Sequence, residues 1–255
     1  MNERPPLRSL LASSFSFLAV AAALVTAGGC GRVPGQFEIL NDQVPTSGDS
    51  CTIPVAETVY QGTGTLDVSI VRSSFSTAYL FFPLIENNLP GSGAPNDPNQ
   101  IHVTAFDVDI GMIGSTTPGA QQVMNDADPA LLHFQVPWSG GVSSNGGHIS
   151  AAVEAVPVDL ALQLAGAGGL SAGPGLRLNL KIQARGTTNS GRSLVSDPFD
   201  FPVEVCNGCL VGNVAPCPYK PTNTGNACNP AQDDVVDCCT QNGNLICPAQ
   251  GGIGS

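Results

Sequence analysis

The chain has 255 residues, with 30 glycines, 21 prolines and a formal net charge of −11, although only 11% of its residues are charged. This length fits one sizeable domain with appendages, and so much glycine and proline favours turns and short strands over long helices. The nine basic residues are too sparse to form a patch that binds nucleic acid or anionic lipid headgroups, so we expect no nucleic-acid partner.

The N-terminus is typical of an export signal. Arg4 and Arg8 form a short basic region, and an uncharged, largely apolar run follows as far as Cys30. The run ends in TAGGC, which resembles the lipobox of bacterial lipoproteins, although Ala27 stands where leucine or valine is commoner. We predict a lipoprotein signal peptide over residues 1–29 and lipidation of Cys30. The alternatives are cleavage near Ala27 without lipidation, or an uncleaved anchor helix.

The segment from residue 30 to residue 64 is mixed in composition and rich in turn-forming residues. This composition predicts a tether between the lipidated Cys30 and the body of the protein. Cys51 is the feature of this segment that calls for a long-range partner.

Residues 65–205 show the alternation of period two that is typical of antiparallel strands with one face in solvent. In LRLNLKIQAR (176–185), apolar side chains alternate with polar and basic ones almost without exception. The other strand candidates are LDVSIV (66–71), AYLFFPLIEN (78–87), QIHVTAFDVDIGM (100–112), LLHFQVPW (131–138), GHISAAVEAVPVDLALQL (147–164) with a bend, and FDFPVEV (199–205). Seven strand candidates separated by long loops predict an immunoglobulin-like antiparallel β-sandwich, with a closed barrel as the alternative.

The histidines and serines do not form a recognisable catalytic or metal-binding motif. His102, His133 and His148 show neither His-x-His nor HExxH spacing, and His133 alternates with apolar residues as a solvent-facing strand residue would. The chain has no G-x-S-x-G motif for a serine nucleophile. We therefore expect no metal, no cofactor and no enzymatic activity.

Two kinds of charged group on the strands and loops allow a ligand-binding alternative. The acidic groups are Asp107 with Asp109, Asp126 with Asp128, and Asp233 and Asp234 with Asp237. Such carboxylates bind calcium when nearby carbonyls complete the shell, but solvated acidic faces are more common. The basic stripe consists of Arg177, Lys181 and Arg185. It could receive an acidic partner or a polysaccharide, although such a stripe more often keeps a sheet face soluble.

The C-terminal segment is rich in cysteine. Seven of the nine cysteines lie between residues 206 and 247, among Pro, Asn and Gly, so this segment cannot build an apolar core of its own. If Cys30 carries lipid, eight cysteines remain and can pair completely. They are Cys51, Cys206, Cys209, Cys217, Cys228, Cys238, Cys239 and Cys247. We predict four disulfides that hold residues 206–255 as an irregular C-terminal cap.

Two details of the pairing follow from the positions of the cysteines. The odd number in the cap predicts that Cys51 pairs with one of them, at the end of the last strand. Neighbouring Cys238 and Cys239 would strain a mutual bond, so each is expected to have its own partner.

Two other kinds of site could use Cys206 and Cys209. Zinc at Cys206 and Cys209 would need a second half-site, and a redox centre there would need a helix after the motif. Both remain alternatives to the disulfides.

Several stretches of the chain together carry a resemblance to a known group. They are GTGTLDVSIV, LIENNL, NQIHVTAFDVDI, DPFDFPVEVCNGCLV and CNPAQDDVVDC, the last matching C-x-x-[GA]-Q-D-x-x-V-D-C with Ala231 where glycine is expected. With the lipobox, they resemble uncharacterised cysteine-tailed lipoproteins of myxobacteria and related bacteria. The resemblance implies a location in the cell envelope and no known activity.

These observations predict a cell-envelope lipoprotein, anchored in the outer membrane or at the cell surface through its N-terminal lipid. Its expected role is that of a structural or protein-interaction module with a protein or polysaccharide partner. The alternative is a surface module that binds calcium or a glycan.

Overall fold

The computed structural model describes residues 35–46, 51–55, 58–71, 78–93, 95–114, 117–166, 170 and 175–248. The predicted signal peptide and Cys30, the predicted site of lipidation, lie outside these residues. Among the described residues, no helix has both the length and the apolar composition that a membrane span requires.

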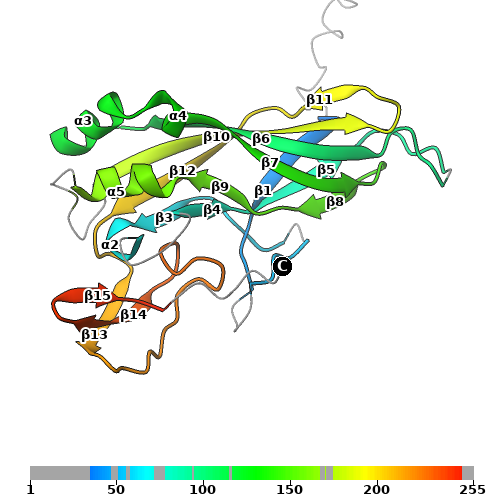
Figure 1. Ribbon diagram of the computed structural model, residues 1–255. Helices are drawn as coiled ribbons and strands as arrows, with labels where there is room; N and C mark the ends of the chain where they lie inside the picture. The colour runs from blue at the N-terminus through cyan, green and yellow to red at the C-terminus, as the bar shows by residue number, and fades with distance from the viewer. Residues whose placement is uncertain are drawn as a thin grey trace, which may run out of the picture. The chain divides into compact units, whose positions relative to one another are not determined.

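The protein is all-β, as the sequence predicted, and its largest sheet has the order β3-β12-β10-β6-β7, with β11 paired to β10 (Figure 1). These strands are β3 (Gly64–Asp67), β6 (Ile101–Met112), β7 (His133–Val142), β10 (Leu176–Thr188), β11 (Ser193–Val195) and β12 (Phe199–Cys206). Its pairings are antiparallel except between β3 and β12, which run parallel. The immunoglobulin-like strand order stays a prediction.

A second layer covers one face of this sheet. It contains a four-stranded sheet of order β2-β1-β5-β8 and the antiparallel pair β4-β9. The strands are β1 (Phe37–Gln43), β2 (Tyr60–Gln61), β4 (Tyr79–Phe81), β5 (Pro83–Asn87), β8 (Gly147–Ser150) and β9 (Val153–Val156). Phe81 of β4 packs on Phe199 and Phe201 of β12, with ring centroids 5.7 and 5.2 Å apart. These rings join the two layers across one apolar core.

Strand β10 shows how the sequence pattern builds this core. Leu176, Leu178 and Leu180 are at most 2% exposed, whereas Arg177 and Lys181 on the other face are exposed. Since alternate side chains of a strand point to opposite faces of a sheet, the apolar set faces the second layer and the basic set faces solvent.

The sequence predicted a tether over residues 30–64, and this prediction is wrong for the residues that form strands. Residues 37–43 form β1, which lies between β2 and β5 in the second layer. Phe37 and Ile39 are buried, as expected for a strand, but so are Asp42 and Gln43. Because Asp42 and Gln43 are polar yet buried, the sequence of β1 does not show the alternation of apolar and polar residues by which the other strands were predicted.

Helices replace several segments that the sequence predicted as strand, bend or loop. They are α2 (Val68–Val71), α3 (Pro118–Asp126), α4 (Pro129–Leu132) and α5 (Val158–Gly166), and in Figure 1 the last three gather at one end of the sheets. The predicted strand LDVSIV therefore ends at Asp67. Thr117 caps α3 by accepting a hydrogen bond from the Ala120 amide, and Pro118 follows it at the first helical position. Both are standard helix-start signals.

The C-terminal cap, residues 206–248, is more regular than predicted. It contains a three-stranded sheet of order β13-β14-β15, formed by β13 (Val211–Pro216), β14 (Val236–Gln241) and β15 (Asn244–Ile246). β13 and β14 are parallel, and β14 and β15 form an antiparallel hairpin. Among the described residues of the cap, the prediction of an irregular structure holds for residues 207–210, for most of the segment between β13 and β14, and for residues 247–248.

Candidate functional site

All eight cysteines among the described residues are disulfide-bonded. The pairs are Cys51–Cys228, Cys206–Cys209, Cys217–Cys239 and Cys238–Cys247. As the odd number of cap cysteines predicted, Cys51 pairs into the cap, and Cys238 and Cys239 have separate partners. The partner of Cys51 is Cys228, not a cysteine at the end of β12. The disulfide therefore spans 177 residues and joins the segment after β1 to the middle of the cap.

The segment after Cys228 docks on the body like an additional strand. Gln232 is fully buried, and its side-chain amide donates to the Leu80 carbonyl at 2.9 Å and accepts from the Leu80 amide at 2.7 Å. The Asp67 amide donates to the Ala231 carbonyl at 2.9 Å, and the Asp233 amide donates to the Thr65 carbonyl at 3.0 Å. CNPAQDD thus satisfies backbone groups of β3 and β4 that would otherwise be buried without partners.

A buried acidic cluster lies where this segment meets the body. Asp233 accepts hydrogen bonds from the Thr65 amide at 2.9 Å, from Gln61 Nε2 at 3.0 Å and from the Tyr79 hydroxyl at 3.2 Å. The same Gln61 Nε2 donates to Asp42 Oδ2 at 3.0 Å, so one amide bridges two carboxylates. The Phe82 amide donates to the other oxygen of Asp42 at 2.6 Å.

Burial dominates the ionisation of this cluster. Desolvation raises the pKa of Asp42 from 3.8 to about 8, and the nearby charge of Asp233 raises it further, against the lowering effect of the hydrogen bonds from Phe82 and Gln61. Burial likewise raises the pKa of Asp233, and it raises the pKa of Tyr79 well above its usual value. Shifted pKa values of this kind occur at functional sites and in structural networks. Because these groups bond to one another and to strand amides, the cluster acts as a clamp between cap and body.

Asp237 organises the inside of the cap. Asp237 is 1% exposed, and its carboxylate accepts hydrogen bonds from the backbone amides of Asn213, Thr222 and Asn223 at 2.9–3.0 Å. The side chains of the same three residues also donate to it, at 2.6–3.2 Å. These donors hold the pKa of Asp237 well below its usual value, with the Thr222 side chain the largest cause. Asp237 therefore fixes two turns of the cap against β14.

Replacing Asp237 with asparagine should loosen the cap. Both carboxylate oxygens of Asp237 accept hydrogen bonds, and the NH2 group that replaces one of them in asparagine cannot accept from the same N–H and O–H donors. We expect faster hydrogen exchange at the amides of Asn213, Thr222 and Asn223, measured by mass spectrometry or NMR. The exposed neighbour Asp234 provides the control Asp234→Asn. Equal exchange in the two variants would contradict the role of Asp237.

In the unaltered protein, the lowered pKa of Asp237 also makes stability depend on pH. The stability that Asp237 adds is present above about pH 4 and is lost in stronger acid.

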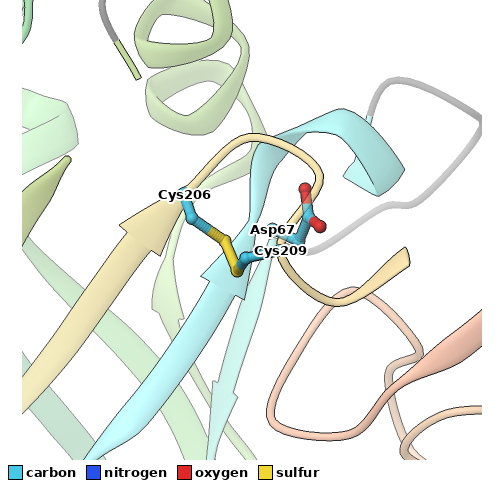
Figure 2. Close-up of side chains that lie close together, drawn as sticks. All are labelled: Asp67, Cys206 and Cys209. Carbon is cyan, nitrogen blue, oxygen red and sulfur yellow. A yellow bond between two sulfur atoms is a disulfide. The ribbon is translucent and has the colours of Figure 1, made fainter. Parts of the chain in front are cut away.

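A third cluster combines Asp67 with the C-x-x-C pair at the end of β12. Figure 2 shows Cys206 and Cys209 joined by their disulfide beside Asp67, and one carboxylate oxygen and the two sulfurs lie within 4.8 Å of one another. Two thiolates and a carboxylate could hold a metal ion. In the disulfide form the sulfurs bond to each other and cannot act as thiolate ligands. Residues 207–210 form bends and lead into β13, so the helix that a conventional redox motif would need does not follow.

Asp67 is engaged with the backbone of this motif. Its carboxylate accepts from the Gly208 amide at 2.7 Å and the Leu210 amide at 2.8 Å, and from the amide and hydroxyl of Ser69 at 3.0 and 2.7 Å. Asp67 is fully buried. It joins the turn after β12 to the beginning of α2.

The structure does not bring the three histidines together. His102 and His133 lie at opposite ends of the β6–β7 pairing, and His148 belongs to β8 in the other layer. The His133 side chain is 63% exposed, as predicted, and its Nδ1 lies 2.7 Å from Asp109. His102 Nε2 lies 2.9 Å from the Asn189 side-chain oxygen, and His148 Nε2 lies 3.4 Å from Glu86.

The basic stripe is neutralised by acids on neighbouring strands. Arg177 pairs with Glu204 at 2.5 Å, and Arg185 pairs with Asp107 at 2.5 Å. Lys181 is in register with Asp109 on one side and Asp200 on the other. The charges that offered a site for a polysaccharide or calcium thus face one another across the sheet.

Asp126 and Asp128, which the sequence offered as a possible calcium-binding pair, lie at the ends of two helices. Asp128 caps α4 by accepting from the Ala130 amide at 2.9 Å, and Asp126 accepts from Gln122 one turn earlier in α3 at 2.5 Å. The two carboxylates have separate local roles in the described structure.

No protein-family model matches the chain, and a search of curated proteins finds no significant match. The fold and the three clusters therefore provide the grounds for a functional proposal.

Sequence reasoning missed Asp42, Gln61, Asp67, Tyr79 and Gln232, which take part in the buried polar contacts between the body and the cap. Asp67 and Tyr79 lay in predicted strands, where nothing distinguishes a buried polar residue from a solvated one. One signal in the sequence could have indicated this contact. In CNPAQDD, Gln232, Asp233 and Asp234 closely follow Cys228, a cysteine expected to form a disulfide.

Proposed function

We propose that the chain is an exported, lipid-anchored protein of the cell envelope, at the outer membrane or cell surface, and that it serves as a structural or protein-interaction module. The observation that carries the proposal is the complete pairing of eight of the nine cysteines with one another. Disulfides persist in oxidising compartments outside the cytoplasm. The pairing of the other eight cysteines agrees with the even number that remains if Cys30, at the end of the TAGGC motif, carries the lipid.

The contacts of the charged groups support a structural role. Asp237, Asp67 and Asp233 each accept several hydrogen bonds from backbone amides and side chains, and Arg177 and Arg185 are paired across strands. Side chains used in this way stabilise turns and sheet faces and are poorly placed to turn over a substrate. The same pairing argues against the calcium- or glycan-binding alternative. The resemblance to cysteine-tailed lipoproteins of myxobacteria agrees with an envelope location.

The exposed apolar side chains near β2 offer a surface for a protein partner. Val55, Val59 and Tyr60 are 56%, 51% and 60% exposed, and β2 is an edge strand of the second layer. Apolar and aromatic side chains at an open strand edge are typical of interaction sites.

Cys30→Ala should move the protein from the membrane fraction to the soluble exported fraction, because a lipid chain supplies the anchoring energy that this acidic protein lacks. The measurement is immunoblotting of separated membrane and soluble fractions, with intact mass of the purified protein to detect the added lipid. Cys217→Ala is the control, because it removes a cap cysteine without touching the anchor. If Cys30→Ala fractionates like the unaltered protein, the lipid anchor is ruled out.

Calorimetric titration separates the proposed module from its alternative. We expect no heat of binding for calcium or envelope polysaccharide. Binding that Asp107→Asn abolishes would favour the ligand-binding alternative.

A further inference from the structure

The Cys206–Cys209 disulfide differs from the other three in what it connects. The others span 177, 22 and 9 residues and join separate segments of the chain. Cys206 and Cys209 are three positions apart and belong to one turn at the end of β12. This disulfide therefore does not join two separate segments. A structural role accounts for it less well than for the other three disulfides.

The turn has other restraints that do not depend on the sulfur–sulfur bond. Asp67 accepts hydrogen bonds from the amides of Gly208 and Leu210, on either side of Cys209. Strand β12 is paired as far as Cys206, which is in register with Asp67 of β3. Opening the disulfide would leave these backbone hydrogen bonds intact, so the reduced turn can keep its conformation.

The two sulfurs have different surroundings. Cys206 is 2% exposed, and its Sγ lies 3.6 Å from the Leu66 carbonyl oxygen, which can accept a hydrogen bond from a thiol. Cys209 is only half-buried. Cys209 is thus the more exposed residue of the pair and the more accessible to an attacking thiolate, and the sulfur that leaves is the one that already has an acceptor for its new proton.

We propose that Cys206 and Cys209 form a thiol–disulfide exchange centre whose electron donor is a dithiol. A thiolate of the donor attacks Cys209 Sγ, a mixed disulfide forms, and the bond to Cys206 breaks. Cys206 leaves with the electron pair and takes up a proton. The second thiol of the donor loses its proton and attacks the donor sulfur of the mixed disulfide, which releases Cys209 as a thiolate that is then protonated. Two electrons and two protons pass from the dithiol, which becomes a disulfide, to the cysteine pair.

Asp67 is a positioning residue in this scheme. One oxygen of its buried carboxylate lies within 4.8 Å of both sulfurs, and Figure 2 shows the three side chains together. A nearby negative charge disfavours a thiolate at either sulfur. Cys206 is therefore held as a thiol after it leaves. A protonated Cys206 attacks the mixed disulfide more slowly than a thiolate would, so reversal of the first step is slowed.

The decisive experiment is graded reduction of the full-length protein under native conditions. Dithiothreitol is the probe, free thiols are trapped with N-ethylmaleimide after acid quenching, and peptide masses locate them. We expect Cys206 and Cys209 to react at a dithiothreitol concentration roughly tenfold below that needed for the other six cysteines. Reduction of Cys238–Cys247, the next shortest disulfide, before or together with Cys206–Cys209 would overturn the proposal.

Single variants test which sulfur is attacked. Cys206→Ser leaves Cys209 free, and Cys209→Ser leaves Cys206 free. We expect Cys209 to form a mixed disulfide with glutathione disulfide roughly tenfold faster than Cys206 does, because it is the more exposed sulfur. Equal rates, or a faster Cys206, would contradict the assigned roles.

The pH profile of alkylation tests Asp67. In the reduced protein, Asp67→Asn should shift the rise in alkylation rate of Cys206 to lower pH by about one unit, because a negative charge is removed. Asp234→Asn is the charge-matched control and should leave the profile unchanged. An unshifted profile in folded Asp67→Asn would remove Asp67 from the scheme. If that variant does not fold, the order of reduction in the unaltered protein still decides whether the exchange centre exists.

Discussion

Replacing Cys51 and Cys228 together with alanine will lower the free energy of unfolding by roughly 5 kcal/mol, the largest effect that we expect from any disulfide of this protein. Their disulfide closes a loop of 177 residues, and in the chain-entropy model the stabilisation grows with the length of the closed loop. The measurement is urea unfolding without reductant, followed by circular dichroism.

The matched control is the double variant of Cys206 and Cys209. Its loop spans three positions, so the same model gives a loss of only roughly 2 kcal/mol. Both variants remove two cysteines and one bond, and they differ mainly in loop length. Equal losses would mean that the Cys51–Cys228 disulfide does not restrain the unfolded chain as the model requires.

The second large effect is a stability that rises as the pH falls from 8 to about 4. Burial raises the pKa of Asp42 from 3.8 to about 8, so over this range the folded protein binds a proton that the unfolded chain has released. The contribution of Asp42 is fully present below about pH 4 and is lost as the pH rises to 8. One such group changes the free energy of unfolding by up to ~1.4 kcal/mol per pH unit.

Other carboxylates also shape this dependence of stability on pH. The pKa of Asp233 is also raised and acts in the same direction, whereas those of Asp97 and Asp237 are lowered, so their contributions disappear below about pH 4. We therefore expect maximal stability near pH 4 to 5. Chemical unfolding at a series of pH values provides the measurement, and Asp42→Asn should flatten the slope between pH 5 and 8. A stability that is level or rises toward pH 8 in the unaltered protein would contradict the burial of a neutral Asp42.

Where side chains alternate by the rule of a half-solvated sheet, the sequence predicted the structure well. β10 is the clearest case, since Leu178 and Leu180 face the core and Arg177 and Lys181 face solvent. The parity of the cysteines was equally informative, because it predicted that Cys51 pairs into the cap. Both arguments use only local pattern or counting.

The clamp could not be predicted, because its residues break the rule that polar side chains face solvent. Asp42 and Gln43 are fully buried in β1, so the strand resembled a tether. Tyr79 lay in a predicted strand, yet its hydroxyl bonds to Asp233, which is 154 residues further along the chain. Gly64 allows this contact, because a Cβ atom there would collide with the Tyr79 hydroxyl. Only the three-dimensional arrangement shows that these residues meet.

The helices were missed for a different reason. α3 carries its start signals at Thr117 and Pro118, but it lies in a segment rich in glycine and proline. Only Ala120 and Met124 of α3 are buried, which is too few to produce a marked period of 3.6 residues.

The disulfide pattern also constrains how the protein matures. Ribosomes make the chain from its N-terminus, so the eight cysteines that form the disulfides become available in the order Cys51, Cys206, Cys209, Cys217, Cys228, Cys238, Cys239 and Cys247. An oxidant that joined these eight two by two in that order would form none of the four native disulfides. Cys51 must remain unpaired, or exchange a wrong partner, until Cys228 has been made. Correct maturation therefore requires either that the sheets assemble before oxidation or that a disulfide isomerase corrects the early pairs.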